Sequence, residues 1–172
     1  MIIRGWQSLG RFDPNAVQNL KNAHSAGYPS SMTDVYFYPC LSCGDAAGQV
    51  ASFWNSVVAN KMDFKRLWFD IEGTWYSSQA SNRAFFEELT GKAQAYGIVY
   101  GIYASSYYWG EIVGSGYTFK YASTSPLWYP HYDNKATFSD FKPFGGWSAP
   151  YIKQYAGDKT LCSTDVDYDY GH

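Results

Sequence analysis

The stretch Arg66-Leu67-Trp68-Phe69-Asp70-Ile71-Glu72-Gly73 decides the fold, because it joins a run of large apolar residues to two carboxylates one residue apart. The apolar run predicts a β-strand. Side chains alternate along a strand, so Asp70 and Glu72 point to the same side at its carboxyl end. Two acids this close cannot both ionise freely, and one tends to keep its proton near neutral pH. Such a pair is typical of sites that cleave glycosidic bonds. A structural alternative stays open, in which the acids cap a following helix or meet a basic residue.

The composition indicates a globular chain that is rich in aromatic side chains. Its 172 residues are enough for one domain with a hydrophobic core, and 46% of them are hydrophobic. Aromatic residues make up 20% of the chain; their apolar faces and polar tips suit stacking on sugar rings, although abundance alone favours a carbohydrate ligand only weakly. The formal net charge is −2 and basic residues do not cluster, which gives no electrostatic basis for binding nucleic acid or an anionic membrane.

The three cysteines, Cys40, Cys43 and Cys162, leave several interpretations open. Cys40 and Cys43 could form a redox motif, contribute half of a zinc site or form a local disulfide. A zinc site needs two further ligands at suitable spacing, but only Cys162 and three scattered histidines remain. A redox motif should open a helix, whereas Gly44 and Asp45 indicate a turn. A structural disulfide between Cys40 and Cys43 is therefore favoured, no metal or other cofactor is expected, and Cys162 is left over.

Strand and helix patterns alternate along the first two thirds of the chain. Strands are expected at 2–3, 35–38, 67–71 and 98–103. The first helix is expected to begin at Asp13-Pro14, with Asp13 as its cap and Pro14 in its first turn; further helices are expected through the apolar stripe of Val50, Phe53, Trp54, Val57 and Val58, over 81–96 and near 107–113. Three further strands are expected near 127–129, 151–155 and 166–168, without full helices between them.

This order of elements predicts a barrel. Four strand–helix units argue for a parallel sheet with right-handed crossovers, and the three trailing strands favour an irregular barrel over an open sheet. The active site of such a barrel lies at the carboxyl ends of the strands, where Asp70 and Glu72 fall. Seven strands would leave a gap in a barrel that closes with eight.

Eight short stretches match one known pattern in order and spacing. They are Ile3-Arg4-Gly5, Asp13-Pro14-Asn15, Asp34 to Cys40, Trp68 to Glu72, Tyr100 to Tyr103, Pro126 to Tyr132, Ile152 to Tyr155 and Val166-Asp167. Each alone is weak, but together they are specific, and the chain resembles a glycoside hydrolase family 25 lysozyme of the eukaryotic type.

The resemblance implies an irregular TIM-like (β/α)5(β)3 barrel that hydrolyses the β-1,4 bond between N-acetylmuramic acid and N-acetylglucosamine in bacterial peptidoglycan. It implies that Glu72 is the general acid and that Asp70 and Asp167 are further members of the acidic floor. By the same resemblance, four side chains would lie near the substrate: Tyr36, Tyr103, Trp128 and Gln154. The family acts outside the cell or in phagolysosomes, and a monomer without cofactor is expected.

One departure from the family concerns the start of the chain. The family begins with a strand that carries a further catalytic aspartate and, in this branch, a cysteine that would be a natural partner for Cys162. Met1 falls in what resembles the family's second strand. Residues 1–172 are therefore expected to form a single catalytic domain that lacks its first barrel strand, and the start of the chain does not resemble a signal peptide.

Alternatives remain for the last strand and for the function. Asp165, Asp167 and Asp169 alternate on one side and could form either a calcium-like cluster or part of the active-site floor. The chain could also be a catalytically impaired remnant that binds glycan, or a chitinase-like barrel glycosidase. The chitinase-like reading is disfavoured because two aromatic residues precede Asp70 in place of a longer acidic run. Attack on the sugar by its own acetamido oxygen and direct attack by water both stay open.

Overall fold

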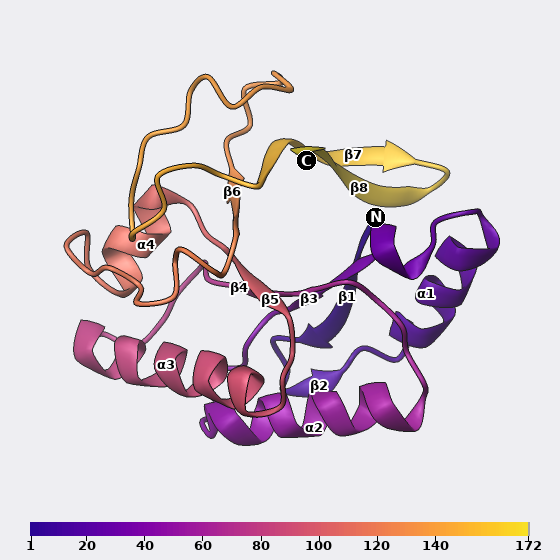
Figure 1. Ribbon diagram of the computed structural model, residues 1–172, viewed down its shortest axis with the longest axis horizontal. Coiled ribbons are helices and arrows are strands. Elements are labelled where there is room, and N and C mark those ends of the chain that lie inside the picture. Colours follow the sequence, from indigo (N-terminus) through magenta and orange to yellow (C-terminus); the bar gives the residue numbers. More distant parts are fainter. Residues whose placement is uncertain (172) are drawn as a thin grey trace.

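One curved sheet of eight strands organises the molecule, whose computed structural model describes residues 1–171. The strand order is β2-β1-β3-β4-β5-β6-β7-β8. β1 and β3 to β7 run parallel, whereas β2 pairs antiparallel with β1, and β8 antiparallel with β7. The strands curve into a half-barrel (Figure 1). Their bounds are β1 (Ile2–Gln7), β2 (Arg11–Phe12), β3 (Asp34–Phe37), β4 (Leu67–Asp70), β5 (Tyr100–Tyr103), β6 (Leu127–Pro130), β7 (Ile152–Leu161) and β8 (Thr164–Gly171).

The helices cover the outer face of this half-barrel, with α2 and α3 side by side below the sheet in Figure 1. They are α1 (Ala16–Ser25), α2 (Ala46–Ala59), α3 (Gln79–Ala95) and α4 (Ser106–Ile112), with a single 3-10 turn at Ser30–Met32. α1 follows the β1–β2 hairpin, and α2, α3 and α4 each follow a parallel strand, which gives the four predicted strand–helix units before β6, β7 and β8. In the described part of the chain, no helix combines the length and the apolar character needed to cross a membrane.

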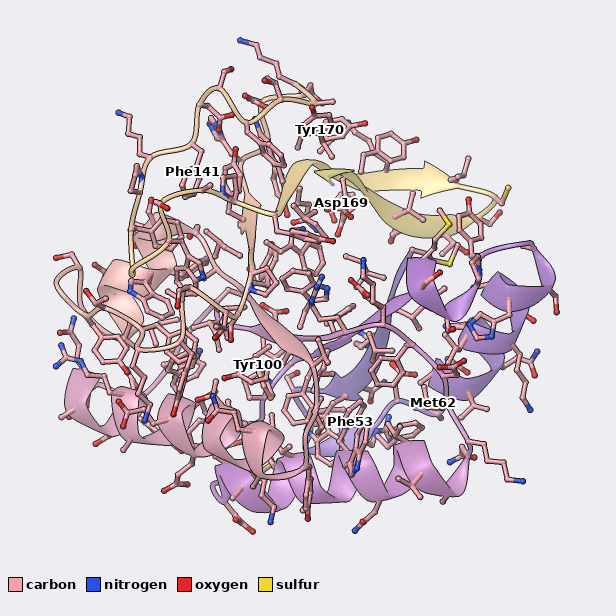
Figure 2. All side chains as sticks on the ribbon, viewed as in Figure 1. Phe53, Met62, Tyr100, Phe141, Asp169 and Tyr170 are labelled. Atoms are coloured by element: carbon pink, nitrogen blue, oxygen red, sulfur yellow. A yellow bond between two sulfur atoms is a disulfide. The ribbon has the colours of Figure 1, made fainter. Side chains whose placement is uncertain are left out.

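The alternation along β4 separates the core from the interior of the half-barrel. Leu67 and Phe69 face the helices and belong to the main hydrophobic core, which also holds Phe53 of α2 and Tyr100 of β5 (Figure 2). Trp68 belongs instead to a separate aromatic cluster inside the half-barrel. Because alternate residues of a strand point to opposite faces, burying Leu67 and Phe69 against the helices directs Trp68 and Asp70 into the half-barrel, as the sequence pattern predicts.

Helix α1 begins later than predicted, and Asp13 does not cap it. Asn15 occupies the N-cap position without a side-chain capping bond. Asp13 is buried, and its Oδ2 accepts hydrogen bonds from Arg4 Nε at 2.6 Å and from Gln7 Nε2 at 3.0 Å. The prediction was wrong because these contacts with β1 come from outside the local sequence of the helix.

The apolar stripe of α2 is narrower than predicted. Val50, Phe53 and Val57 are fully buried or nearly so, whereas Val58 is 61% exposed. Asp45 caps this helix, because its Oδ1 accepts a hydrogen bond from Gly48 N at 2.9 Å.

The sheet has eight strands rather than the predicted seven, and the additional strand does not close it. The extra strand is β2, which is two residues long and pairs only with the end of β1, at Trp6 and Gln7. Within residues 1–171 no pairing joins β1 to β8. A slot of about 500 Å³ lies between them, lined by Ile2 of β1 and by Asp169 and Gly171 of β8.

The last two strands form a longer hairpin than predicted. Their turn is Cys162-Ser163, and both residues have positive φ, 51° and 60°, as the tight hairpin turns that match strand twist require. Cys162 is exposed and forms no disulfide with another described residue.

Candidate active site

A cleft of about 690 Å³ opens at the carboxyl ends of the parallel strands. Its size is that of sites for small organic ligands. The seven side chains predicted for catalysis and substrate binding all line it, although six of them come from six different strands, β3 to β8, and Glu72 lies just past the end of β4: Tyr36, Asp70, Glu72, Tyr103, Trp128, Gln154 and Asp167. The curvature of the sheet therefore brings together residues that lie up to 131 positions apart between Tyr36 and Asp167 (167 − 36).

The two acids of the β4 motif lie in surroundings that disfavour negative charge. Asp70 is only 7% exposed, and its Oδ1 has no hydrogen-bond partner among the described residues. Burial, followed by the charge of Glu72, raises the pKa of Asp70 well above its ordinary value. Partial burial, followed by the charge of Asp167, raises the pKa of Glu72. The cleft thus holds at least one proton more readily than isolated carboxylates would.

Gln154 is the centre of a hydrogen-bond network that joins three strands. Its Oε1 accepts hydrogen bonds from the hydroxyls of Tyr103 and Tyr132, both at 2.7 Å. Its Nε2 donates to Asp167 Oδ2 at 2.9 Å, and the backbone N–H of Asp158 donates to Asp167 Oδ1 at 3.0 Å. Because the amide uses its acceptor and its donor at once, its orientation is fixed, and Asp167 is held beside the β4 acids.

Aromatic rings form a rigid floor beneath the acids. Trp128 packs edge-on against Tyr103, with ring centroids 4.5 Å apart, and against Trp68 at 5.8 Å. Trp128 Nε1 donates to Asp169 Oδ1 at 2.8 Å, and Trp68 Nε1 donates to Asp34 Oδ2 at 2.8 Å. Partial burial raises the pKa of Asp169 to about 6. Since each indole N–H is bonded, both rings are fixed. Trp128 lines the cleft with apolar surface of the kind that packs against sugars, and the fully buried Trp68 supports it.

The three alternating aspartates of β8 do different things and do not converge on one point. Asp167 faces the cleft, Asp169 binds Trp128, and Asp165 lies toward the hairpin end, 3.5 Å from Thr160 Oγ1. The strand thus contributes one acid to the cleft, and the calcium-like interpretation of the three residues has no geometric support.

A different group, His131, Asp133 and Asp140, has ligand atoms close enough to share a cation. Lys153 already fills this position with its own charge. Its fully buried Nζ lies 2.9 Å from Asp133 Oδ1 and 2.7 Å from Asp140 Oδ1. The group is therefore an ion-pair cluster that ties the segment after β6 to β7.

Several cleft residues escaped the sequence analysis. Tyr38 lies two positions after Tyr36, so the alternation of the strand could have found it; burial, then Asp70 and Glu72, raise its pKa to about 12. Tyr132 follows directly on β6, where the strand's carboxyl end could have indicated it. The remaining residues come from the β1–β2 hairpin, where only Arg4 lies in a stretch that matched the family pattern and the others had no recognisable signal: Arg4, Gln7, Ser8, Leu9 and Arg11.

The predicted local disulfide is present and supports this hairpin. Cys40 is bonded to Cys43. The hairpin turns at Gly10, whose φ is +73°, and a Cβ added there would lie 2.5 Å from Cys43 Sγ. Glycine is therefore needed at this position both for its backbone conformation and for the close approach of the disulfide.

An acidic cleft floored with aromatic rings, at the carboxyl ends of parallel barrel strands, is typical of glycoside hydrolases. Comparison with known proteins identifies the family. Residues 1–155 match the family model described as Lysozyme-like protein 1. The chain is 42% identical over 170 residues to Probable GH family 25 lysozyme 2 of Dictyostelium discoideum, covering 98% of this chain and 78% of that protein. It is 43% identical over 176 residues to Lysozyme-like protein 5 of Caenorhabditis elegans, covering 99% and 79%.

The relatives also include Counting factor 50 of Dictyostelium discoideum, 33% identical over 178 residues, which cover 99% of this chain and 57% of that protein. Among solved structures, a family GH25 lysozyme from Aspergillus fumigatus superimposes with a TM-score of 0.75 at 16% identity, over 99% of this chain and 81% of that one. The chain therefore belongs to the glycoside hydrolase family 25 lysozymes.

Proposed function

We propose that this protein is a muramidase, which hydrolyses the β-1,4 bond between N-acetylmuramic acid and N-acetylglucosamine in bacterial peptidoglycan. The observation that carries the proposal is the meeting of Asp70, Glu72 and Asp167 in one aromatic cleft at the carboxyl ends of the strands. Family membership supports the lysozyme-type chemistry. The bond and the polymer are the part that experiment must test.

In this proposal Glu72 is the general acid. It must carry a proton when the substrate binds, and its raised pKa, due first to burial and then to Asp167, favours the protonated form. Asp70 would lie beside the acetamido group of the sugar and orient it. The acetamido oxygen would then attack the anomeric carbon, and direct attack by water with inversion is the alternative route.

The remaining side chains of the cleft would hold the glycan in place. Tyr36, Tyr103 and Trp128 offer aromatic surface, and Gln154 would act through Asp167, which it binds at 2.9 Å. No metal ion or cofactor enters the proposed reaction. β2 pairs with β1 only at Trp6 and Gln7, and a slot separates the first part of β1 from β8; this supports the finer description of the family's fold as a (β/α)5(β)3 barrel.

We further propose that the protein acts as a monomer outside the cell or in phagolysosomes. The Cys40–Cys43 disulfide supports the proposed location, because disulfides persist in oxidising compartments.

The test is the clearing of bacterial cell walls, followed by analysis of the new reducing ends. The wild-type protein should lower the turbidity, and borohydride reduction of the products should convert N-acetylmuramic acid, rather than N-acetylglucosamine, to its alcohol. Glu72→Gln should reduce the rate about 100-fold or more, as the loss of a general acid does. Glu88→Gln, which changes an exposed glutamate on α3, is the matched control and should keep the wild-type rate.

Each other outcome identifies an alternative. Clearing by Glu72→Gln at nearly the wild-type rate would exclude Glu72 as the general acid. Binding to cell walls without clearing would favour a glycan-binding remnant. Faster cleavage of chitin oligomers than of peptidoglycan would favour a chitinase-like enzyme.

A further inference from the structure

The cleft contains two opposite kinds of charge, which come from different parts of the fold. The acids come from β4 and β8, whereas two arginines, Arg4 and Arg11, come from the β1–β2 hairpin. The acids have a role in the proposed hydrolysis. The arginines have none, although both line the same cleft.

A side-chain network orients both guanidinium groups. Asp13, only 3% exposed, accepts hydrogen bonds from Arg4 Nε at 2.6 Å and from Gln7 Nε2 at 3.0 Å. Gln7 in turn accepts a hydrogen bond through Oε1 from Arg11 Nε at 2.8 Å. Asn15 donates its backbone N–H to Asp13 Oδ1 at 2.9 Å. This chain of contacts runs from a buried carboxylate to an exposed arginine and fixes the direction of each.

The network leaves binding capacity at the cleft. Each guanidinium uses its Nε in these bonds. Arg4 also interacts with the hydroxyl of Tyr36, whereas the terminal Nη groups of Arg11 have no partner among the described residues. Asp13 pairs with Arg4, whereas Arg11 bonds to the neutral amide of Gln7, so Arg4, Arg11 and Asp13 together leave an excess of positive charge at the hairpin. The side chain of Arg4 is 48% exposed and Arg11 is exposed as well. A planar guanidinium with free terminal groups matches the two oxygens of a carboxylate.

We propose that the β1–β2 hairpin is a subsite for a carboxylate of the glycan substrate, with Arg11 as its principal ligand and Arg4 beside it. The inference rests on the proposed function and adds that the hairpin recognises the carboxylate groups of the polymer. A polymer of N-acetylglucosamine alone has no carboxylate. Peptidoglycan carries carboxylates on its attached peptides and, where the peptide is removed, on the lactyl group of N-acetylmuramic acid. The hairpin would therefore select the anionic glycan over the neutral one.

The experiment measures binding, separately from cleavage, in the full chain carrying Glu72→Gln to prevent digestion. Three insoluble probes are compared by co-sedimentation: intact peptidoglycan, peptidoglycan whose carboxylates have been amidated with carbodiimide and ammonia, and glycan stripped of its peptides by an amidase. Amidation should weaken binding about 10-fold, the usual scale for a lost charge-assisted pair. Tight binding to the stripped glycan would identify the lactyl carboxylate, and its loss would identify a peptide carboxylate.

Arg11→Gln tests the residue itself. It should weaken binding to intact peptidoglycan about 10-fold and leave binding to the amidated polymer unchanged, whereas Arg11→Lys should restore part of the affinity. Lys21→Gln, an exposed change on α1, is the control. The inference would be overturned if the Glu72→Gln protein, whose hairpin is unchanged, bound intact and amidated peptidoglycan equally well. It would also be overturned by an Arg11→Gln protein that melts normally and binds intact peptidoglycan as tightly as its parent. A wild-type protein that binds in a carboxylate-dependent way but clears no walls would instead refute the muramidase proposal.

Discussion

Replacing Gln154 by leucine removes the centre of the network that holds Asp167. The amide is 4% exposed and makes three hydrogen bonds: two as acceptor, from Tyr103 and Tyr132, and one as donor, to Asp167. Leucine fills a similar volume but offers neither donor nor acceptor, so all three partners lose their bond without a large cavity being opened.

The three partners differ in exposure, and this determines the magnitude. Tyr103 is 5% exposed, so its hydroxyl would lose its acceptor and keep only the contact with the Tyr132 hydroxyl, at a cost of about 2 kcal/mol. Tyr132 is 56% exposed and can turn to water, at about 0.5 kcal/mol. The exposed Asp167 also finds water, again at about 0.5 kcal/mol. The sum is about 3 kcal/mol of unfolding free energy, which for a chain of this size lowers the melting temperature by about 6–12 °C.

The assay is denaturant unfolding of four proteins: wild type, Gln154→Leu, Tyr103→Phe and the double variant. Tyr103→Phe removes the hydroxyl that would lose its acceptor. Gln154→Leu should therefore cost at least about 1 kcal/mol less in the Tyr103→Phe background than in the wild type. Gln94→Leu is the control, because this exposed glutamine also bonds to a tyrosine hydroxyl, in this case as the donor, to Tyr100 at 3.1 Å. It should cost less than about 0.5 kcal/mol. Additive effects of the two site variants, or a cost of Gln154→Leu below about 1 kcal/mol, would refute the reasoning.

Three further predictions follow from the charges of the structure. Asp167→Asn removes a charge that raises the pKa of Glu72, so the alkaline limb of kcat/KM should move to lower pH; an unmoved limb would contradict this coupling. The pKa of Asp169 is raised from 3.8 to about 6. The protonated side chain therefore contributes stability to the folded protein that is fully present below pH 3.8 and is lost as the pH rises through 6. Asp169→Asn should therefore stabilise the fold at pH 7.5 by about 1 kcal/mol, a figure reduced for solvent screening, and should not do so near pH 3; an equal gain at both pH values would argue against it. Lys153→Met leaves two carboxylates of the ion-pair cluster without their buried partner and should cost about 3 kcal/mol in thermal unfolding; a change below about 1 kcal/mol would show that the cluster is not needed for stability.

The sequence predicted those parts of the fold in which local pattern and packing agree. The apolar run of β4 has the period of a strand, so the direction of Asp70 and Glu72 followed from alternation alone. The predicted strand–helix units were found because each apolar face packs on the neighbouring layer. Tyr103, Trp128 and Gln154 were placed by family resemblance, since nothing in their own spacing indicates a shared cleft.

Other features depend on contacts that a sequence pattern does not contain. Asp13 has the sequence context of a helix cap, but the guanidinium of Arg4, on a different element, binds its carboxylate. Strand β2 is too short to have a period, yet it places Arg11 in the cleft. Val58 continues an apolar stripe in the sequence, but it is 61% exposed, so no neighbouring element covers it. In each case the tertiary partner decides the outcome.

Gly10 packs closely against the Cys40–Cys43 disulfide, so the position of the β1–β2 hairpin in the cleft depends on whether the surroundings are oxidising or reducing. Two thiols need more room than one bonded pair, and the hairpin turn lies against these sulfur atoms with no side chain of its own to yield. The bridge closes a ring of four residues, so its loss should affect the position of the hairpin more than the survival of the fold. A protein made in a reducing compartment would thus be folded but would hold its substrate less well until it reached an oxidising one.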